Sequence, residues 1–545
     1  MRKNRKIFKE DCSTMLDMLI KNGTIIDGTG KPSFPGSVGV MGDKIVMAKG
    51  DEEAKTVIDA TGRIICPGFI DAHSHGDLIL GRDFARLAKT SQGVTTEMTG
   101  QCGLSMAPIN PKTMKLIQGM LMIGAPDFPD DEMIGWTDYK YYMDYCDKQQ
   151  KSANIKFLVG HSTLRVAVMG FDNRDSTDEE LEKMKELLCN AMENGAAGLS
   201  TGLVYTPSCY ASTREIVELA KVIAPYGGIY CSHMRDESVN IVEAVEEVLT
   251  IGREAKVPVC ISHHKVMGKK NWDLQKKTLE MIDAAVKEGI SVTCDQYPYT
   301  WNQTALNVIV PPWYFDHGVE AMAKLLEDPD MRRKIREEID DTSGKYDNYF
   351  LNAGSWDGVM VTTSPACPEV EGKTIGEYAR ELGKDPYDTF FEILVMNKGD
   401  SSAVFNTMKD ENLFDVILNE NAIVGSDGLT RALNEKSHPR AYGTMPRAIN
   451  YYVRENHIMS LEAMINKMTG ETAKRLHFRS KGIIADGYDA DILVIDWDNF
   501  YDRATYVNSC ELTDGIDYVI VNGEVVWHDK QFTGRFPGRV IRHEK

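Results

Sequence analysis

Two histidines stand one residue apart in GFIDAHSHGDL, residues 68–78, directly after a short apolar run. Every second side chain of a β-strand lies on the same face. If residues 68–73 form a strand, His73 and His75 can therefore reach toward one point. Such a pair binds a metal ion in some proteins and is exposed on a loop in others, so its interpretation depends on which residues join it.

Other metal-binding residue types follow apolar segments elsewhere in the chain. They are Cys102 in MTGQCGLS, His233 in CSHMRDE, His263 and His264 in ISHHKV, and Asp427 in VGSDGL. Imidazole, thiolate and carboxylate groups are the ligands that zinc prefers. Taken singly, each residue has a structural explanation, such as a core histidine, a cysteine in a turn or an aspartate that caps a helix. Their shared position at the ends of apolar segments favours a metal site.

The middle of the chain, residues 67–474, alternates between strand-like and helix-like segments. The strand-like segments are GFIDAHSH, GVTTEM, IKFLVGH, AAGLSTG, GGIYCSHM, VPVCISHH, ISVTCDQY and NAIVGSDG. Eight β/α units predict an α/β fold built on a (β/α)8 TIM-like barrel, in which active residues lie at the carboxyl ends of the strands. Strand alternation points His264 away from His263, so we expect His264 to support the site or to be structural, and not to bind the metal.

Segments outside these eight units predict further parts of the fold. Residues 16–66 and 475–545 are rich in short β segments and are expected to pair into one small β-sandwich domain. More than a hundred residues separate the last two barrel strands, so we expect an inserted lid subdomain at about 300–358. Residues 1–15 are expected to be a frayed tail.

Composition excludes several classes of partner. The 62 basic and 81 acidic residues give a net charge of −19, which argues against nucleic acid or an anionic membrane. The chain has no apolar run long enough to span a membrane, and Lys9, Glu10, Asp11 and Asp17 interrupt any signal-peptide core. Eleven scattered cysteines predict reduced thiols in a cytoplasmic protein.

These motifs carry a family resemblance that spans about residues 16–540. PGFIDAHSHGD, GSDG and the closing MTGETAKRLHFRSKGIIADGYDADILVID resemble the amidohydrolase superfamily. Within it, TGQCG, GHSTLR, SHMRDE, ISHHK, DQYPYT and HPRAYGTMPR resemble the N-acyl-D-amino-acid deacylases, also called D-aminoacylases. In this resemblance a cysteine takes the place of the carboxylated lysine that many superfamily members use.

The resemblance implies zinc-dependent hydrolysis of the amide bond of N-acyl-D-amino acids, a small-molecule reaction. It implies one tightly held zinc and a second, weaker site. The implied ligands are Cys102, His233 and His263 for the first, and His73, His75 and Asp427 for the second. The preference for D substrates is implied by the resemblance alone.

Asp427 is also our candidate for the general base and acid, because the attacking water must lose a proton and the leaving amine must gain one. The substrate's free carboxylate needs cationic or donor groups. The resemblance favours Lys265, Tyr297 and Arg440 for this task, and Arg235, two residues after His233, is a fourth candidate.

Three alternatives stay open. The first is a cyclic-amide hydrolase of the hydantoinase or dihydroorotase type, or a dipeptidase, although these usually carry a lysine at the end of the fourth strand and AAGLSTG has none. The second is a barrel that has lost its ligands and acts as a scaffold, which the six ligand residues disfavour. The third is a zinc store, for which a barrel of this size is not needed.

Overall fold

Eight parallel strands surround the centre of the fold, which a computed structural model describes for residues 15–124 and 128–544. In chain order they are β6 (Phe69–Asp71), β7 (Val94–Thr99), β8 (Asn154–Phe157) continued by β9 (Val159–Gly160), β10 (Gly198–Gly202), β11 (Ile229–His233), β12 (Val259–Ile261), β13 (Val292–Gln296) and β17 (Ala422–Val424). Each coincides with one of the eight strand-like segments of the sequence. The predicted barrel is confirmed.

Hydrogen bonds close these strands into a ring. Strands β6 to β8 pair in parallel, and so do β9 to β13 and β17. Only Leu158 separates β8 from β9. The last strand meets the first through a parallel bridge between Ser74 and Gly428, and the amide of Ala72 donates to the carbonyl of Val424 at 3.4 Å. The carboxyl ends of all eight strands therefore face the same side.

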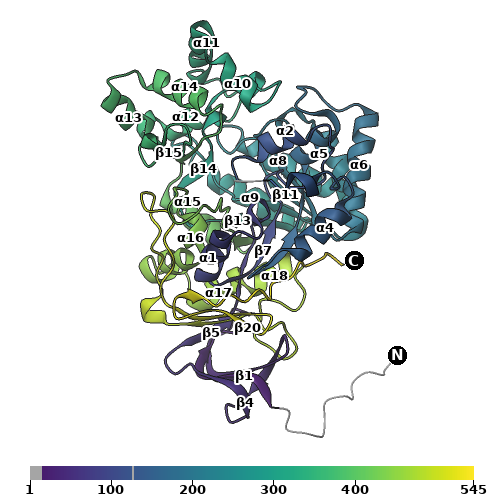
Figure 1. The fold of residues 1–545 in the computed structure, drawn as a ribbon, viewed down its shortest axis with the longest axis vertical. Coiled ribbons are helices and arrows are strands. Elements are labelled where there is room, and N and C mark those ends of the chain that lie inside the picture. Colours follow the sequence, from purple (N-terminus) through teal and green to yellow (C-terminus); the bar gives the residue numbers. More distant parts are fainter. Residues whose placement is uncertain (1–14, 125–127, 545) are drawn as a thin grey trace.

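Amphipathic helices cover the outside of the barrel (Figure 1). They include α1 (Asp83–Ser91), α4 (Tyr139–Lys148), α5 (His161–Met169), α6 (Asp178–Glu193), α7 (Thr213–Ile223), α8 (Ile241–Ala255), α9 (Leu274–Lys287), α15 (Asp410–Leu418), α17 (Leu461–Met468) and α18 (Gly470–Arg475). Helix α6 shows why such a segment is helical. Thr177 and Glu180 form a reciprocal capping box, and Leu181, Met184 and Leu188 lie on the buried face.

The two ends of the chain share a nine-stranded sheet below the barrel (Figure 1). Its strands are β1 (Leu16–Ile25), β2 (Phe34–Met41), β3 (Lys44–Ala48), β4 (Ala54–Asp59), β5 (Ile64–Pro67), β18 (Ile492–Ile495), β19 (Ile516–Val521), β20 (Glu524–His528) and β21 (Gln531–Phe532). The sheet branches at β1, and antiparallel pairing of β5 with β18 joins the two halves. Ile20, Val40, Ile492 and Ile520 from both halves pack in one hydrophobic cluster.

The predicted tail of residues 1–15 lies outside the described residues, except for the exposed Met15. The last described residues leave the β domain to which the sequence assigned them. The amide of Ile541 donates to the carbonyl of Ile155 at 2.7 Å, and the amide of His543 donates to the carbonyl of Gly195 at 2.9 Å. This segment therefore packs on the barrel beside β8.

The inserted subdomain is longer than predicted. Its antiparallel sheet consists of β14 (Trp301–Ala305), β16 (Ser402–Asn406) and β15 (Val359–Thr363), with β16 in the centre. Its helices are α10 (Val319–Leu325), α11 (Pro329–Ile339), α12 (Tyr349–Ala353), α13 (Ile375–Leu382) and α14 (Pro386–Met396), which lie above the barrel in Figure 1. The expected end near residue 358 is wrong, because the central strand of this sheet ends at Asn406.

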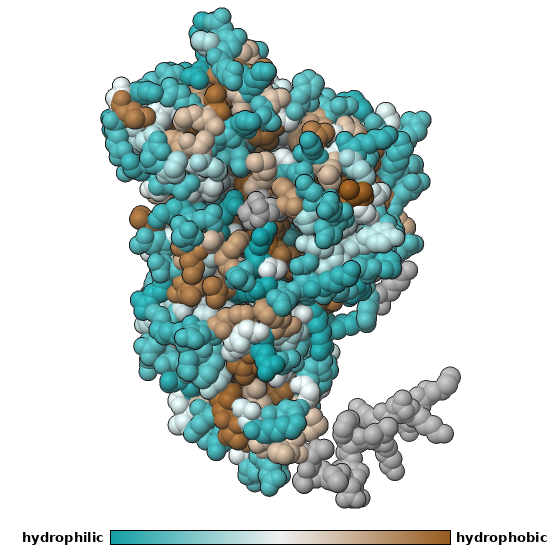
Figure 2. All heavy atoms as spheres, in the orientation of Figure 1, coloured by the Kyte–Doolittle hydropathy of each residue, from teal (hydrophilic) through white to brown (hydrophobic). Residues whose placement is uncertain are grey.

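No helix in residues 15–124 or 128–544 is long and apolar enough to cross a bilayer. The ten cysteines in these ranges are free thiols. Figure 2 shows hydrophilic side chains over most of the visible face, with apolar side chains between the inserted subdomain and the barrel.

Candidate metal centre and active site

The six ligands expected from the sequence converge at the carboxyl ends of the barrel strands. They are His73 and His75 after β6, Cys102 after β7, His233 at the end of β11, His263 after β12 and Asp427 after β17. All are buried, with at most 6% of the residue exposed. The barrel therefore gathers residues that are scattered over more than 350 positions of sequence.

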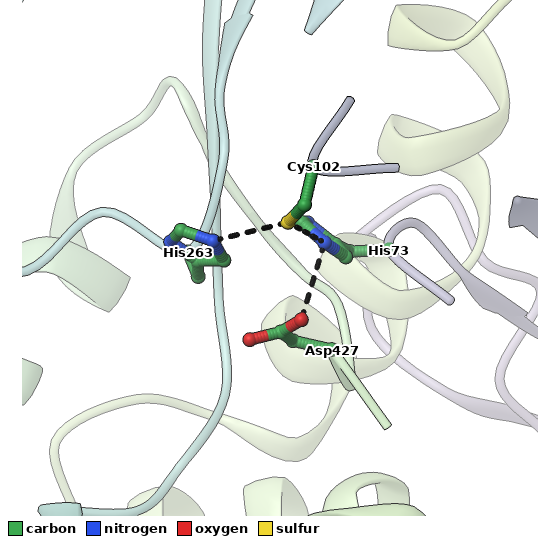
Figure 3. Close-up of side chains that lie close together, drawn as sticks. All are labelled: His73, Cys102, His263 and Asp427. Carbon is green, nitrogen blue, oxygen red and sulfur yellow. Dashed lines mark hydrogen bonds and ion pairs between the residues drawn. The ribbon is translucent and has the colours of Figure 1, made fainter. Parts of the chain in front are cut away.

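Four of these residues form a compact cluster around the thiol (Figure 3). Cys102 Sγ lies 3.3 Å from His73 Nε2 and 3.4 Å from His263 Nε2. Asp427 Oδ1 lies 3.3 Å from His73 Nε2. One donor atom from each residue falls within 4.8 Å of all the others, which is the arrangement that a single metal ion requires.

His75 and His233 flank this cluster. His75 Nε2 lies 3.2 Å from Asp427 Oδ1, and the His233 ring centre lies 4.4 Å from that of His263. Neither ring nitrogen of His233 has a hydrogen-bond partner, and the same holds for His75 Nδ1. Each buried polar atom without a hydrogen-bond partner costs about 1–3 kcal/mol of stability, and a bound metal ion removes that cost for the nitrogen that coordinates it. The donor set therefore fits zinc.

The geometry also joins residues that the resemblance assigned to different ions. Cys102 lies between His73 and His263, and His263 belongs to a second group with His233 and Glu237. In that group Glu237 Oε2 lies 3.6 Å from His233 Nε2. Two neighbouring metal positions that share His263 are thus available.

Three of the candidate ligands have left-handed backbone conformations. The φ angles of Cys102, His263 and Asp427 are 53°, 37° and 49°. Such conformations cost about 1–3 kcal/mol each in residues other than glycine and persist where the surroundings impose them. The amide of Asp427 donates to the carbonyl of His73 at 2.8 Å, and the amide of His263 donates to Asp295 Oδ1 at 2.8 Å. These bonds hold the turns after the strands.

Two carboxylates orient the histidines. His73 Nδ1 lies 3.3 Å from Asp295 Oδ2, and His263 Nδ1 lies 3.0 Å from Glu237 Oε1. At His73, a carboxylate that accepts from Nδ1 leaves Nε2 deprotonated and directed at the metal. At His263, the Lys265 ammonium group also lies 2.8 Å from Nδ1, so Glu237 and Lys265 together hold this ring. Both Nε2 atoms face Cys102, as metal binding requires.

Sequence reasoning did not select Glu237 or Asp295. The sequence position of each residue could have identified it as a candidate. Glu237 follows His233 by four residues in SHMRDE, and Asp295 stands in the strand-end segment CDQY. A carboxylate near a strand end is also common on protein surfaces. Only the packing of neighbouring strands shows that these two face imidazoles.

The surroundings favour the ionised forms of the thiol and the carboxylate. Burial raises the pKa of Cys102, but before a metal ion binds, positive charge on His73 and His263 outweighs burial and holds that pKa well below its ordinary value. Burial likewise opposes ionisation of Asp427. Arg440, His263 and His73 outweigh it and hold the Asp427 pKa well below its usual range. The site thus presents a thiolate and a carboxylate to a cation.

Three of the expected substrate-binding residues gather beside the cluster. Lys265 Nζ lies 5.9 Å and Arg440 Cζ 4.7 Å from the centre of the Tyr297 ring. Arg440 Nη1 is 2.9 Å from Asp427 Oδ2. The Tyr297 hydroxyl and Arg440 Nε have no hydrogen-bond partner. Burial raises the pKa of Tyr297 well above its ordinary value, so its hydroxyl is a neutral donor.

The fourth expected substrate residue, Arg235, is committed elsewhere. Its Nε and Nη2 donate to Glu247 at 3.1 Å and 2.9 Å, and its other donors reach two backbone carbonyls. Arg235 borders the cavity but, unlike Arg440, has no buried nitrogen without a hydrogen-bond partner, which argues against a role in substrate binding. His264 Nε2 lies 3.0 Å from Thr278 Oγ1 on α9, outside the metal cluster.

One cavity joins these groups. Its volume is about 890 Å³, near the upper end of the roughly 300–1,000 Å³ that is typical of small-molecule sites. Its wall includes Cys102, His263 and Asp427 as well as Lys265 and Arg440. The metal ligands and the cationic groups therefore face the same ligand-sized space.

A (β/α)8 barrel with imidazole, thiolate and carboxylate ligands at its carboxyl rim defines a metal-dependent hydrolase. The chain belongs to the amidohydrolase family, whose model matches residues 56–527. It is 36% identical to a D-aminoacylase of Alcaligenes xylosoxydans xylosoxydans over 97% of this chain and 98% of that protein. An N-acyl-D-aspartate deacylase of the same organism is 32% identical over 98% of this chain and 96% of that protein.

A solved structure extends the comparison. The N-acyl-D-glutamate deacylase of Bordetella bronchiseptica, in complex with zinc and a phosphonate inhibitor that mimics the tetrahedral intermediate, is 32% identical to this chain. The TM-score is 0.80, and the match covers 97% of this chain and 100% of the other. The barrel, the β domain and the inserted subdomain are therefore parts of a known architecture.

Proposed function

We propose that this protein hydrolyses the amide bond of N-acyl-D-amino acids and releases a carboxylate and a free D-amino acid, with zinc as its metal. Relatives with this activity in their names match nearly the whole chain, and one of them is known with bound zinc. The observation that carries the proposal is one cavity whose wall includes Cys102, His263 and Asp427 of the metal cluster together with the cationic Lys265 and Arg440.

We assign the tightly held zinc to Cys102, His233 and His263. A second, weaker site would use His73, His75 and Asp427. The position of Cys102 between His73 and His263 supports two adjacent ions, one held by each set. When bound, zinc supplies Lewis acidity and lowers the pKa of a water molecule from 15.7 to about 7.

Asp427 is the group that moves the proton. Its Oδ1 lies 3.2 Å from His75 Nε2, and its Oδ2 is 2.9 Å from Arg440. Because the Asp427 pKa is held low, the carboxylate is ionised before the reaction and is ready to accept the proton of the attacking water. Asp427 then donates this proton to the amine nitrogen, because an amide anion is a poor leaving group.

The substrate's α-carboxylate would bind between Lys265, Tyr297 and Arg440. Lys265 supplies an ammonium group, Tyr297 a neutral hydroxyl and Arg440 the unpartnered Nε. Charge-assisted hydrogen bonds of this kind are about twice as strong as neutral ones. These bonds would place the substrate's amide nitrogen near Asp427, since Arg440 would contact both the α-carboxylate and Asp427.

A substrate panel tests this proposal. Zinc-loaded protein would be assayed with N-acetyl-D- and N-acetyl-L-amino acids, hydantoin, dihydroorotate and a dipeptide. We expect turnover of the N-acetyl-D-amino acids and at least about 100-fold less of the others, because specific polar contacts discriminate strongly. Turnover of the cyclic amides without turnover of the N-acetyl-D-amino acids would overturn the proposal.

We also propose that the protein acts in the cytoplasm on this small molecule, without nucleic acid or an anionic membrane as a partner. The net charge of −19 and the ten free thiols of the described residues support this. Fractionation of the native source would test the location, and recovery with the membrane pellet would contradict it.

A further inference from the structure

We infer that the cavity selects N-acyl-D-amino acids whose side chain and acyl group are uncharged and largely apolar, and that it disfavours acyl-D-aspartate and acyl-D-glutamate. This inference rests on the proposed function. The relatives do not decide the question, because identities of 36% and 32% to deacylases of different specificity are similar. The composition of the cavity wall decides it.

The wall offers one cationic site for one carboxylate. Among the described lining residues, the fully buried lysine and arginine side chains are Lys265 and Arg440, and both lie beside the same Tyr297 ring. Lys265 already pairs with Glu237, and Arg440 with Asp427. The two cations therefore leave room for no more than one further carboxylate, the α-carboxylate that every substrate of this class carries. A second carboxylate, on the side chain of aspartate or glutamate, would need a second buried cation.

The remaining cationic side chains of the wall do not supply that second site. Arg235 is paired with Glu247 and, unlike Lys265 and Arg440, has 33% of its side chain in solvent. Lys115 is exposed, and Lys345 and Lys398 have 65% and 74% of their side chains in solvent. Solvent screens exposed charges, so these rim lysines add little to recognition of a buried carboxylate.

Apolar side chains begin immediately beside the metal ligands. Leu104 follows Cys102 by two residues, and Leu429 follows Asp427 by two. The amide of Leu203 donates to the carbonyl of His233 at 2.9 Å, which places this leucine next to the cluster.

Further out, Met120, Phe171 and Val308 extend the apolar wall. Figure 2 shows apolar side chains where the inserted subdomain meets the barrel. The buried Asp347 adds an acid to the wall, not a cation. Asn302, Gln303 and Thr304 add uncharged polar groups. The space that receives the rest of the substrate is therefore lined by apolar, neutral polar and acidic side chains, without a second buried cation among the described lining residues.

This wall should raise kcat/KM for substrates with apolar side chains relative to substrates with charged side chains. A single methylene in an apolar pocket is worth about 10- to 200-fold in specificity. An ionised carboxylate that is buried without a partner is strongly disfavoured. We therefore expect kcat/KM for N-acetyl-D-leucine and N-acetyl-D-methionine to exceed that for N-acetyl-D-aspartate and N-acetyl-D-glutamate by at least about 100-fold.

The experiment measures these four values on zinc-loaded, full-length protein. The expected order supports the inference. Equal or faster hydrolysis of the aspartate or glutamate derivative overturns the inference and leaves the proposed function standing. Failure to hydrolyse any of the four would overturn both, so the two failures are distinguishable.

Substitution of the half-buried Leu104 tests the wall itself. Leu104→Arg places a cation beside the metal cluster, and we expect the ratio of glutamate to leucine activity to rise at least about 10-fold. Leu104→Ala should lower kcat/KM for the leucine derivative about 10-fold and that for the glutamate derivative less, so the ratio of glutamate to leucine activity should rise here too. Leu382→Arg and Leu382→Ala, at a residue of α13 that is 44% exposed and outside the cavity, are the controls.

Zinc content and thermal melting of each variant separate a change in selectivity from a loss of the site. If Leu104→Arg does not fold, the ratio of glutamate to leucine activity in Leu104→Ala tests the inference. An unchanged ratio in a folded, zinc-loaded Leu104 variant overturns the inference.

Discussion

The carboxylate of Glu237 accepts a hydrogen bond from the ammonium group of Lys265 at 2.7 Å, and both groups are buried. The same oxygen, Glu237 Oε1, lies 3.0 Å from His263 Nδ1. One atom therefore contacts both a candidate metal ligand and a candidate substrate-binding residue. Metal affinity and substrate affinity should respond together when this atom changes.

Glu237→Gln tests this connection, because the amide keeps the shape of the side chain and removes its charge. We expect zinc affinity to fall about 10- to 100-fold, the usual effect of losing a carboxylate that orients a ligand histidine. KM should also rise, because Lys265 loses the partner that fixes its position. Chelator competition gives the zinc affinity, and steady-state kinetics separate KM from kcat.

Glu186→Gln is the matched control, since Glu186 is exposed on α6. It should leave zinc affinity and KM unchanged. If Glu237→Gln changed neither quantity, Glu237 would have no positioning role.

Asp427→Asn should retain the tightly held zinc and lose turnover. The amide cannot accept the proton of the attacking water, and general base catalysis contributes about 10²- to 10⁴-fold. We therefore expect kcat to fall by at least about 100-fold while metal analysis still finds about one zinc ion. Asp415→Asn, on the exposed side of α15, is the control. A variant with nearly normal kcat would show that another group moves the proton.

Cys102→Ala should remove metal and activity together. Cys102 Sγ is the donor that lies between His73 and His263, and no other thiol belongs to the cluster in the described part of the chain. We expect zinc affinity to fall by more than the roughly 10- to 100-fold that loss of an orienting partner costs. Zinc content after dialysis is the measurement. Cys189→Ala, in α6, should retain its zinc, and equal zinc retention by Cys102→Ala would exclude the thiol as a ligand.

The convergence of the six candidate ligands could be predicted from the sequence because each follows an apolar run that forms a barrel strand. Local pattern is sufficient for that step, and barrel topology brings the strand ends together. The ends of the inserted subdomain could not be predicted in this way. MVTTS in β15 has the same local pattern as a barrel strand, and only its antiparallel pairing with β16 shows that it belongs to the insertion.

The contacts between side chains of different helices and strands could not be predicted from the sequence either. Glu237 meets His263 from the next strand, and Asp295 meets His73 from the first barrel strand. Arg235 was selected for its charge, but α8 places Glu247 against it. Such pairings depend on how helices and strands pack, and no spacing within one segment specifies them.

Tyr297→Phe should weaken substrate binding without disturbing the fold. The Tyr297 hydroxyl is buried without a hydrogen-bond partner, so its removal breaks no bond within the protein. A hydrogen bond to a charged group is worth about 1.5–3 kcal/mol, so we expect kcat/KM to fall about 10- to 150-fold, chiefly through KM. Tyr142→Phe removes another unpartnered buried hydroxyl, outside the cavity, and should change neither constant. Equal kinetics for the two variants would exclude Tyr297 from carboxylate binding.

Glu215 links two elements of the barrel wall through an ion pair away from the cavity. Its carboxylate lies 2.8 Å from Arg165 Nη1 and 2.8 Å from His161 Nε2, and all three side chains are buried. Burial opposes ionisation of Glu215, but His161 and Arg165 outweigh it and lower the Glu215 pKa far below its ordinary value. The folded state therefore binds this proton less tightly than the unfolded chain does.

A carboxyl group with a lowered pKa in the folded state stabilises the fold above the pKa of the unfolded chain, about 4.3, and this contribution is lost as the pH falls further. Glu215→Gln lacks this contribution. At pH 7 we expect it to unfold more easily, by about 3–5 kcal/mol, because Arg165 remains buried without its partner. Between pH 7 and pH 3.5 its melting temperature should fall less than that of the unsubstituted protein. Melting curves of zinc-free protein at both pH values, with Glu186→Gln as control, measure this difference. An equal decrease in Glu215→Gln and the unsubstituted protein would show that Glu215 does not set the acid sensitivity of the barrel.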